Sequence, residues 1–343
     1  MAAMRPWKKD FAGRLDELEI ESKLLLGNRR GDPHVRPLWI YTPPADRARG
    51  RRLPTIYLLQ GWTGQIDMWK NRAALRPTSL ELFDELFASG AAPPAILVFV
   101  DAWTSWGGSQ FLDSPALGPY HSYLCEEIVP FVDARYPTLA SRDHRGITGK
   151  SSGGYGAMVT AMMRPDLFGA IGTHAGDALF ELCYAPNFPR SVRTLRDEYG
   201  GSFERFLAEH ATRPAFSKKS DMDLLADWSM ASCYSAEPDG TVLLPFDVET
   251  GERNHEVWQR WLDLDPVRMA SRHRDALRSM RAIYIDAGKR DEWYLDLGAM
   301  AFHREATAAA AKDVFFELFD ATHMAIEYRY PVALKYLAER LGA

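Results

Sequence analysis

The sequence predicts an α/β protein built on a doubly wound, mostly parallel β-sheet. Short runs of apolar residues, bounded by glycine or polar residues, are typical of central strands covered by helices on both faces. Segments with apolar residues at three- and four-residue spacing alternate with these runs. Alternating strands and helices indicate a parallel sheet, whose ligands bind at the carboxyl ends of the strands. A polar or glycine-rich loop follows each predicted strand, so we expect the chemistry there.

The elements follow in chain order. The turn-rich stretch GNRRGDP separates two alternating segments, 15–26 and 34–41, and predicts a leading hairpin. Apolar runs then predict six central strands: Thr55–Leu59, Ala95–Val100, His144–Thr148, Phe168–Thr173, Arg281–Ile285 and Val314–Phe319. Helical spacing predicts helices at Leu80–Ala88, Tyr120–Arg135, Gly154–Met163, Leu297–Lys312 and Ile326–Leu341.

Residues 177–280 interrupt this alternation with prolines, short helical segments and bulky aromatic residues. Because the stretch lies between two predicted strands and contains none itself, it predicts a helical cap over the sheet. We therefore expect a single α/β domain over residues 1–343. Its core would comprise about 15–176 and 281–341, and its cap insertion about 177–280.

The composition is that of an ordinary globular protein, with 343 residues, 46% hydrophobic and 25% charged. A net charge of −5 gives no indication of nucleic-acid binding. The longest apolar run, Pro93–Val100, is too short to cross a bilayer, and the N-terminus lacks the apolar core of a secretory signal. These features predict a cytoplasmic protein without a membrane partner; a homo-oligomer stays open. Buried reduced thiols are expected at Cys125, Cys183 and Cys233.

The sharpest motif is Gly149-Lys-Ser-Ser-Gly153, which lies directly after a predicted strand and directly before a helix. It satisfies G-x-S-x-G in the context of a nucleophile elbow, where small flanking residues permit a strained turn that presents the serine hydroxyl. Ser151 is therefore the candidate nucleophile. A serine N-cap in a glycine-rich turn is the structural alternative. A P-loop would need glycine at position 144, which is histidine.

A serine nucleophile needs a histidine base and a carboxylate that orients it, and in this architecture both follow later strands in the order acid, then histidine. Among nine histidines, His323 follows the last predicted strand. For the acid we favour Asp291, which lies past a glycine turn after the preceding strand. Asp286 and Glu292 are the fallback candidates.

An oxyanion hole requires two backbone donors. We expect the amide of Ser152, the residue after the nucleophile, and the amide of Trp62, from the loop after the first central strand. Gly61 would permit a close approach of that loop. Substrate sites are largely apolar and aromatic, which gives a set of pocket candidates: Gly61, Trp103, His174, Trp228 and Trp258.

Together these residues resemble the α/β-hydrolase putative-esterase family, which includes esterase D, feruloyl esterases, enterochelin-esterase-like proteins and antigen 85-type mycolyltransferases. The resemblance rests on 56–64, 149–158 with 164–168, 285–291 and His323. It implies that Ser151 is the nucleophile, Asp291 the acid and His323 the base. The chain departs from the family pattern at Gln60, where histidine is common, and in the length of its cap.

The hypothesis is hydrolysis of a small-molecule carboxylic ester through an acyl-enzyme, without a metal or cofactor. Three alternatives remain open. An acyltransferase would use the same triad with an alcohol acceptor. A peptidase or amidase would also cleave amides. A non-catalytic binding protein would keep the fold without the chemistry.

Overall fold

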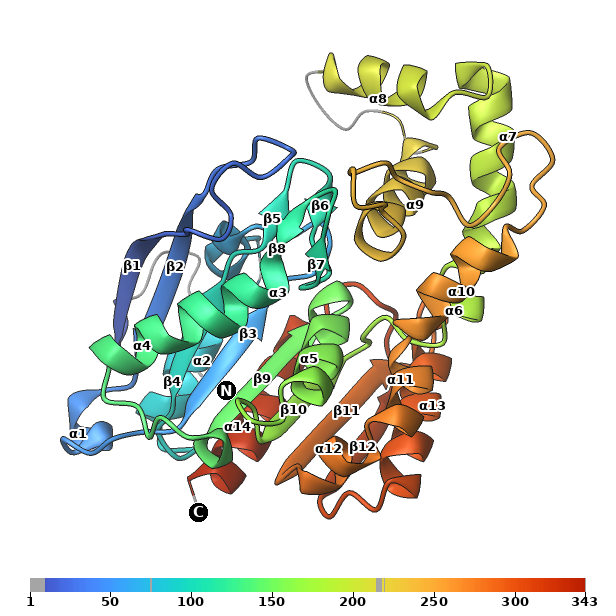
Figure 1. The fold of residues 1–343 in the computed structure, drawn as a ribbon. Helices are drawn as coiled ribbons and strands as arrows, with labels where there is room; N and C mark the ends of the chain where they lie inside the picture. The colour runs from blue at the N-terminus through green and yellow to red at the C-terminus, as the bar shows by residue number, and fades with distance from the viewer. Residues whose placement is uncertain (1–9, 75, 214–217, 219, 343) are drawn as a thin grey trace.

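The protein is an α/β molecule with one central eight-stranded sheet, seen in a computed structural model that describes residues 10–74, 76–213, 218 and 220–342 (Figure 1). The strand order is β1-β2-β4-β3-β9-β10-β11-β12. The six strands from β4 to β12 pair in parallel, while β2 pairs antiparallel with both β1 and β4. The predicted doubly wound, mostly parallel sheet with a leading hairpin is confirmed.

The predicted strands agree closely with the observed ones. The bounds are β1 Arg14–Glu21, β2 Val35–Thr42, β3 Thr55–Leu59, β4 Ile96–Val100, β9 Arg145–Lys150, β10 Ala170–His174, β11 Ala282–Gly288 and β12 Val314–Phe319. All residues of β3 and β4 are buried, which explains their uninterrupted apolar sequences. Two small hairpins follow β4, formed by β5 Trp103–Thr104 with β6 Gly107–Gly108, and by β7 Asp113–Ser114 with β8 Gly118–Pro119.

Helices cover both faces of the sheet. On one face, α2 Ser79–Ala88 and α14 Tyr330–Leu341 pack over a cluster that includes Phe83 and Leu334. The larger cluster on the other face lies beneath α3 Tyr120–Ser122, α4 Val129–Arg135, α5 Ser152–Met163 and α13 Leu295–Ala308. A short α1, Ala45–Ala48, follows β2.

The helix predicted over Tyr120–Arg135 is interrupted. Residues Tyr123–Ile128 form a π-helical segment between α3 and α4. Pro130 lies in the first turn of α4 and has no N–H to donate to the preceding turn, which explains why regular α-helical bonding does not run through this stretch. The helix predicted over Ile326–Leu341 begins later, at Tyr330, after a 3₁₀ turn.

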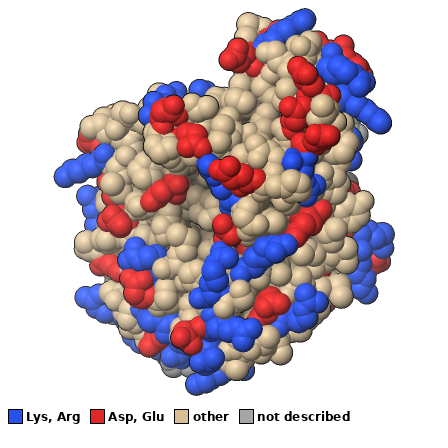
Figure 2. All heavy atoms as spheres, turned by 45° about the vertical axis from the view of Figure 1, so that its right-hand side comes forward, with Lys and Arg blue, Asp and Glu red and all other residues tan. Residues whose placement is uncertain are grey.

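Helices make up most of the described insertion between β10 and β11, but residues 235–254 are a non-helical segment with two isolated β-bridges, Ala236 with Val242 and Phe246 with Arg253. The helices are α6 Phe180–Cys183, α7 Phe188–Tyr199, α8 Phe203–Ala211, α9 Asp221–Tyr234, α10 His255–Asp263, α11 Pro266–Arg272 and α12 Arg274–Ser279. Figure 1 shows α7, α8 and α9 beyond the carboxyl ends of the strands. In Figure 2 this region projects from the main body, and acidic and basic side chains are interspersed over the visible face.

The last part of the insertion belongs to the helix layer rather than to the projecting region. Both α11 and α12 contact α5, and α11 also packs on α13. An aromatic cluster joins the two regions, because the ring of Tyr155 on α5 lies 5.7 Å from that of Tyr234 on α9 and 5.9 Å from that of Phe180. The cap is therefore packed directly on the helix that follows the candidate nucleophile.

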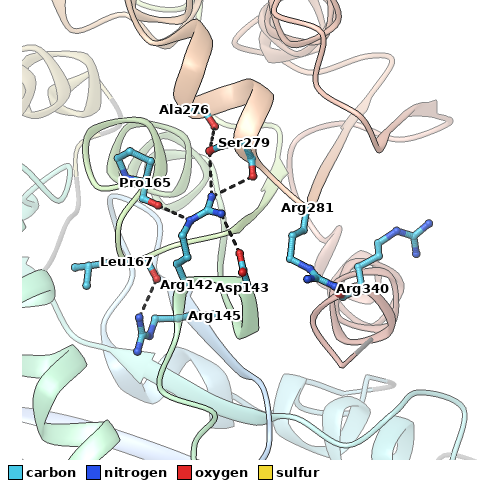
Figure 3. Close-up of polar contacts among 9 residues, drawn as sticks. All are labelled: Arg142, Asp143, Arg145, Pro165, Leu167, Ala276, Ser279, Arg281 and Arg340. Atoms are coloured by element: carbon cyan, nitrogen blue, oxygen red, sulfur yellow. Dashed lines mark hydrogen bonds and ion pairs between the residues drawn. The ribbon is translucent and has the colours of Figure 1, made fainter.

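Arginine side chains bind backbone carbonyls at the amino end of the sheet, opposite the candidate site (Figure 3). The Arg142 guanidinium donates to the carbonyl of Pro165 at 2.5 Å and to that of Ser279 at 3.1 Å. Arg145, the first residue of β9, donates to the carbonyl of Leu167 at 2.8 Å. These bonds hold the loops after α5 and α12 against the start of β9.

Asp227 of α9 is a fully buried carboxyl inside the cap. Burial, together with the negative charge of Asp223, raises the pKa of Asp227 to about 8 despite a hydrogen bond of 2.6 Å from Ser191. An ionised Asp227 is therefore disfavoured in the folded cap.

We predict that Asp227→Asn flattens the pH dependence of stability. A carboxyl whose pKa is higher in the folded than in the unfolded protein stabilises the folded state most at low pH. For Asp227 this stabilisation is fully present below the unfolded pKa of about 3.9, and it is lost as the pH rises to the folded pKa of about 8. The variant should lose less thermal stability than the wild type over that range, as measured by calorimetry. Asp275→Asn, at an exposed carboxyl, is the control. If the Tm of wild type and of Asp227→Asn falls by the same amount over this pH range, the prediction is wrong.

Candidate active site

Ser151 lies at the turn between β9 and α5 in a strained backbone conformation. Its φ of 57° and ψ of −128° are rarely adopted by a residue with a side chain. The N–H of Ser151 donates to the carbonyl of His174 at 3.0 Å, and its carbonyl accepts from Tyr155 N–H at 2.9 Å. The turn thus holds Ser151 at the N-terminus of α5, where the helix dipole favours negative charge.

The small residues of the motif are required by close backbone contacts. A Cβ atom on Gly153 would lie 2.3 Å from the carbonyl oxygen of Leu59, and one on Gly149 would lie 2.4 Å from the carbonyl carbon of Gly153. Larger residues would push the start of α5 away from β3. The structure therefore places G-x-S-x-G in the strand–turn–helix context that the sequence predicts, rather than in an unstrained capping turn.

His323 and Asp291 meet at the carboxyl ends of β12 and β11. Nδ1 of His323 lies 2.7 Å from Oδ2 of Asp291, and both residues are 5% exposed. The other carboxylate oxygen of Asp291 accepts from the N–H of Trp293 at 2.9 Å. The Trp293 ring packs edge-on against the imidazole with centroids 4.8 Å apart. Both the carboxylate and the imidazole are thus fixed in orientation.

The two fallback acids are engaged elsewhere. Glu292 accepts from the backbone N–H of His323 at 2.8 Å, so it anchors the histidine loop rather than the imidazole. Asp286 lies 2.6 Å from Nδ1 of His174 and also accepts from Arg329 at 2.8 Å. Burial alone would raise the pKa of Asp286, but its attraction to His174 and its hydrogen bonds lower it overall.

The loop after β3 lies beside the nucleophile. A Cβ atom on Gly61 would be 3.5 Å from the Lys150 carbonyl oxygen and 3.8 Å from the Ser151 Cβ. The Trp62 carbonyl accepts from Gly108 N–H at 2.7 Å, and its indole N–H donates to the hydroxyl of Ser229 at 2.9 Å. This loop is consequently tied to the β5–β6 hairpin and to cap helix α9.

Gln60, the residue that departs from the family pattern, is 1% exposed. Within the described residues, neither its amide oxygen nor its amide nitrogen has a hydrogen-bond partner. A Cβ on Gly64 would lie 3.2 Å from the Cβ of Gln60, so the two residues are close together in the turn of this loop.

The remaining pocket candidates divide into two groups. Trp228 on α9 packs edge-on with Trp106, whose carbonyl is 3.3 Å from the Trp62 indole nitrogen, and so lies near the loop beside Ser151. Trp103 belongs to the β5–β6 hairpin that contacts the same loop.

His174 and Trp258 lie within packed interiors instead. The His174 ring is 1% exposed and 4.6 Å from the ring of Tyr330, while its carbonyl supports Ser151 from below. Trp258 packs in the cap against Phe188 and Trp261. Both were pocket candidates because they are aromatic, but residue type alone does not indicate whether a side chain points toward a pocket or into the interior.

Asp177, which was not among the site residues predicted from the sequence, contacts the candidate nucleophile Ser151. Its Oδ1 lies 3.3 Å from the Ser151 hydroxyl, and its Oδ2 accepts from the Ser152 hydroxyl at 2.9 Å. Among the described residues, this is the hydrogen bond that the Ser151 side chain makes. Burial raises the pKa of Asp177, opposed by hydrogen bonds from Tyr184, Gln110 and Ser152 and by the nearby His323. Its position three residues after β10, at the carboxyl edge of the sheet, was the signal available in the sequence.

No group of three or more His, Cys, Asp or Glu side chains among the described residues is arranged to hold a metal ion. Within the same residues, no helix has the length and apolar character needed to cross a membrane. The three cysteines are buried and free.

The strand order and the strand–turn–helix at Ser151 define an α/β-hydrolase fold. A sequence profile of the family described as "Putative esterase" matches residues 34–324, and the chain belongs to this family. The predicted family resemblance is confirmed.

Two curated proteins are similar over part of the chain. An endo-1,4-beta-xylanase/feruloyl esterase of Xylanibacter ruminicola is 26% identical over 132 residues, which are 38% of this chain and 17% of that protein. The uncharacterized protein YbbA of Bacillus subtilis is 24% identical over 167 residues, which are 45% of this chain and 59% of that protein. The similarity thus spans less than two thirds of either relative.

Solved structures match nearly the whole chain. A ferulic acid esterase superposes with a TM-score of 0.61 at 18% identity, covering 97% of this chain and all of that one. An S-formylglutathione hydrolase from Agrobacterium tumefaciens gives a TM-score of 0.57 at 18% identity, with 98% of each chain covered. At such low identities these matches establish the α/β-hydrolase fold.

The close contacts of the turn predict that Gly153→Ala destabilises the protein. The added methyl would meet the Leu59 carbonyl, and overpacking of this kind costs about 1–3 kcal/mol. The loss should appear as a lower midpoint in urea unfolding. Gly61→Ala, whose added Cβ would meet the Lys150 carbonyl at 3.5 Å, is the matched control and should unfold near the wild-type midpoint. Equal midpoints for both variants would contradict the steric argument.

Proposed function

We propose that this protein hydrolyses carboxylic esters of small molecules with a triad of Ser151, His323 and Asp291. The observation that carries the proposal is the buried hydrogen bond of 2.7 Å between His323 and Asp291 at the carboxyl edge of the sheet. The strained presentation of Ser151 at the same edge supports it. Membership of the esterase family supports the reaction class.

The first half of the proposed reaction forms an acyl-enzyme. The Ser151 hydroxyl leaves its contact with Asp177 and transfers its proton to Nε2 of His323 while Oγ bonds to the ester carbonyl carbon. Asp291 holds the opposite ring nitrogen of His323 protonated, which keeps Nε2 free to accept the proton and stabilises the imidazolium that forms. His323 then protonates the departing alkoxide, and the alcohol leaves.

The second half uses water. His323 removes a proton from a water molecule, whose oxygen attacks the acyl carbon; Ser151 then leaves and recovers its proton. In both halves the negative oxygen of the tetrahedral intermediate would be bound by the backbone amides of Ser152 and Trp62. Losing one such donor costs about 2.7–4 kcal/mol of transition-state stabilisation, so the short loop at Gly61 is a substantial part of the proposed machinery.

The acyltransferase, amidase and binding-only alternatives make different demands. Transfer requires an alcohol to reach the acyl-enzyme in place of water, and amide cleavage requires a poorer leaving group to be protonated. Product analysis with added alcohols and with anilides in place of esters distinguishes the first two. Absence of any covalent intermediate would indicate the third.

Treatment with a fluorophosphonate probe should add one label per chain, located at Ser151 by peptide mapping and intact mass. A hydroxyl activated by a neighbouring imidazole reacts with such probes, whereas an ordinary serine does not. Ser151→Ala should abolish labelling and ester turnover without unfolding the protein. His323→Ala should also abolish ester turnover. Near-wild-type turnover in either variant would refute the triad.

Substitution of the three carboxylates should have unequal effects. Asp291→Asn should lower kcat by about 10⁴-fold, because the amide favours the wrong histidine tautomer. Glu292→Gln, which alters only the anchor of the His323 backbone, and Asp286→Asn, which alters the His174 contact, should have much smaller effects on kcat. A kcat loss in Asp286→Asn or Glu292→Gln exceeding that of Asp291→Asn would show that the acid is misassigned.

A further inference from the structure

The two carboxylate oxygens of Asp177 have very different surroundings. Oδ2 lies within hydrogen-bonding distance of three donors: the hydroxyl of Tyr184 at 2.8 Å, the hydroxyl of Ser152 at 2.9 Å and the amide of Gln110 at 3.1 Å. Oδ1 has its contact with the Ser151 hydroxyl, at the longer distance of 3.3 Å. The weakly bonded oxygen therefore faces the nucleophile.

The donors on Oδ2 fix the carboxylate firmly. Gln110 has a left-handed backbone, with a φ of 54°, and its amide also contacts the Tyr234 hydroxyl at 2.8 Å. Tyr184 and Tyr234 belong to the insertion, and their hydroxyls lie 3.2 Å apart. Asp177 cannot reorient without breaking this buried network, so Oδ1 keeps its direction toward Ser151.

The tetrahedral intermediate leaves one direction for Oδ1. Of the acyl carbon's other three substituents, the negative oxygen would face the amides of Ser152 and Trp62, and the leaving oxygen would face His323. The third substituent is the carbon chain of the acyl group. Oδ1 contacts Ser151 Oγ, and an acceptor there that serves neither of the first two substituents would lie beside the first carbon of the acyl chain.

If an apolar group of the substrate displaced the one long hydrogen bond to Oδ1, this buried acceptor would be left without a donor, which costs free energy. A hydrogen-bond donor on the substrate avoids that cost. When Ser151 Oγ becomes the ester oxygen of the acyl-enzyme, it loses its proton and can no longer donate to Oδ1. A hydroxyl or ammonium group on the acyl chain could replace that donor. An anionic acyl group would instead meet the carboxylate at close range.

We propose that Asp177 is a specificity-determining residue, whose Oδ1 selects esters that carry a hydrogen-bond donor, hydroxyl or ammonium, on the carbon next to the scissile carbonyl. This inference rests on the esterase function and the Ser151 nucleophile proposed above. According to this proposal, the acyl subsite contains a hydrogen-bond acceptor. The aromatic residues around Trp62 alone would indicate an apolar subsite.

The test compares phenyl esters of butanoic, 2-hydroxybutanoic, 2-methoxybutanoic and 2-aminobutanoic acid on the wild-type protein near neutral pH, where part of the 2-amino ester is still an ammonium. The methoxy ester matches the hydroxy ester in electron withdrawal but cannot donate. After correction for the rate of alkaline hydrolysis of each ester, kcat/KM should favour the hydroxy over the methoxy ester by about 10- to 100-fold. One enantiomer of the hydroxy ester should be preferred, since Oδ1 lies on one side of Ser151.

Asp177→Asn converts the acceptor into a donor. Because three donors surround the Oδ2 position, the amide oxygen should occupy it, and the NH₂ group should replace Oδ1. The variant should therefore lose the preference for the hydroxy ester. It should hydrolyse the methoxy ester at least as fast as the hydroxy ester. Asp227→Asn, the same change at a buried carboxyl that contacts Ser191 in the cap, is the matched control and should keep the wild-type order.

The outcomes separate the two proposals. Wild-type protein that hydrolyses the butanoate and methoxy esters as fast as the hydroxy and amino esters would overturn the role of Asp177 and leave the esterase function intact. No hydrolysis of any ester, together with no fluorophosphonate label on Ser151, would overturn the function itself. If Asp177→Asn does not fold, a hydroxy ester that the wild type hydrolyses no faster than the methoxy ester, or equal rates for its two enantiomers, still overturns the proposal.

Discussion

The fit of the Ser151 turn between neighbouring strands is the constraint on which the rest of the site depends. Gly153 has no room for a Cβ against Leu59 of β3, and the Ser151 N–H is bound by the carbonyl of His174 at the end of β10. The turn therefore requires β3, β9 and β10 to end at matched heights. That parallel register also brings the loops after β11 and β12 to the same edge, where His323 and Asp291 meet.

Much of this arrangement follows from the sequence. The central strands are buried on both faces, so their apolar runs stand out and their ends were predicted closely. Once the strand order is known, residues just after parallel strands must share one edge, which brings Asp291 and His323 together there. Asp286 lies within β11 and is fully buried, so its side chain bonds across the sheet to His174 and Arg329.

Other features depend on contacts between distant segments. Asp177, Gln110 and Tyr184 come from three separate parts of the chain, and a left-handed residue such as Gln110 has no sequence signature when it is not glycine. The cap aromatics show the same limit, because Trp228 and Trp258 are similar in sequence context but occupy different environments. The insertion also supplies α11 and α12 to the helix layer, a division that helical periodicity alone does not reveal.

The indole of Trp62 donates to Ser229 of α9 and lies against the β5–β6 hairpin, so the loop beside the nucleophile, the hairpin and the cap share one set of contacts. These three segments form a single structural unit. A cap exchanged between two such proteins without its matching loop and hairpin would remove the Ser229 acceptor and leave the indole N–H with the longer contact of 3.3 Å to the Trp106 carbonyl. An exchange that keeps this unit whole can place its boundaries at the amino end of the sheet, where arginine side chains bind backbone carbonyls that any residue supplies.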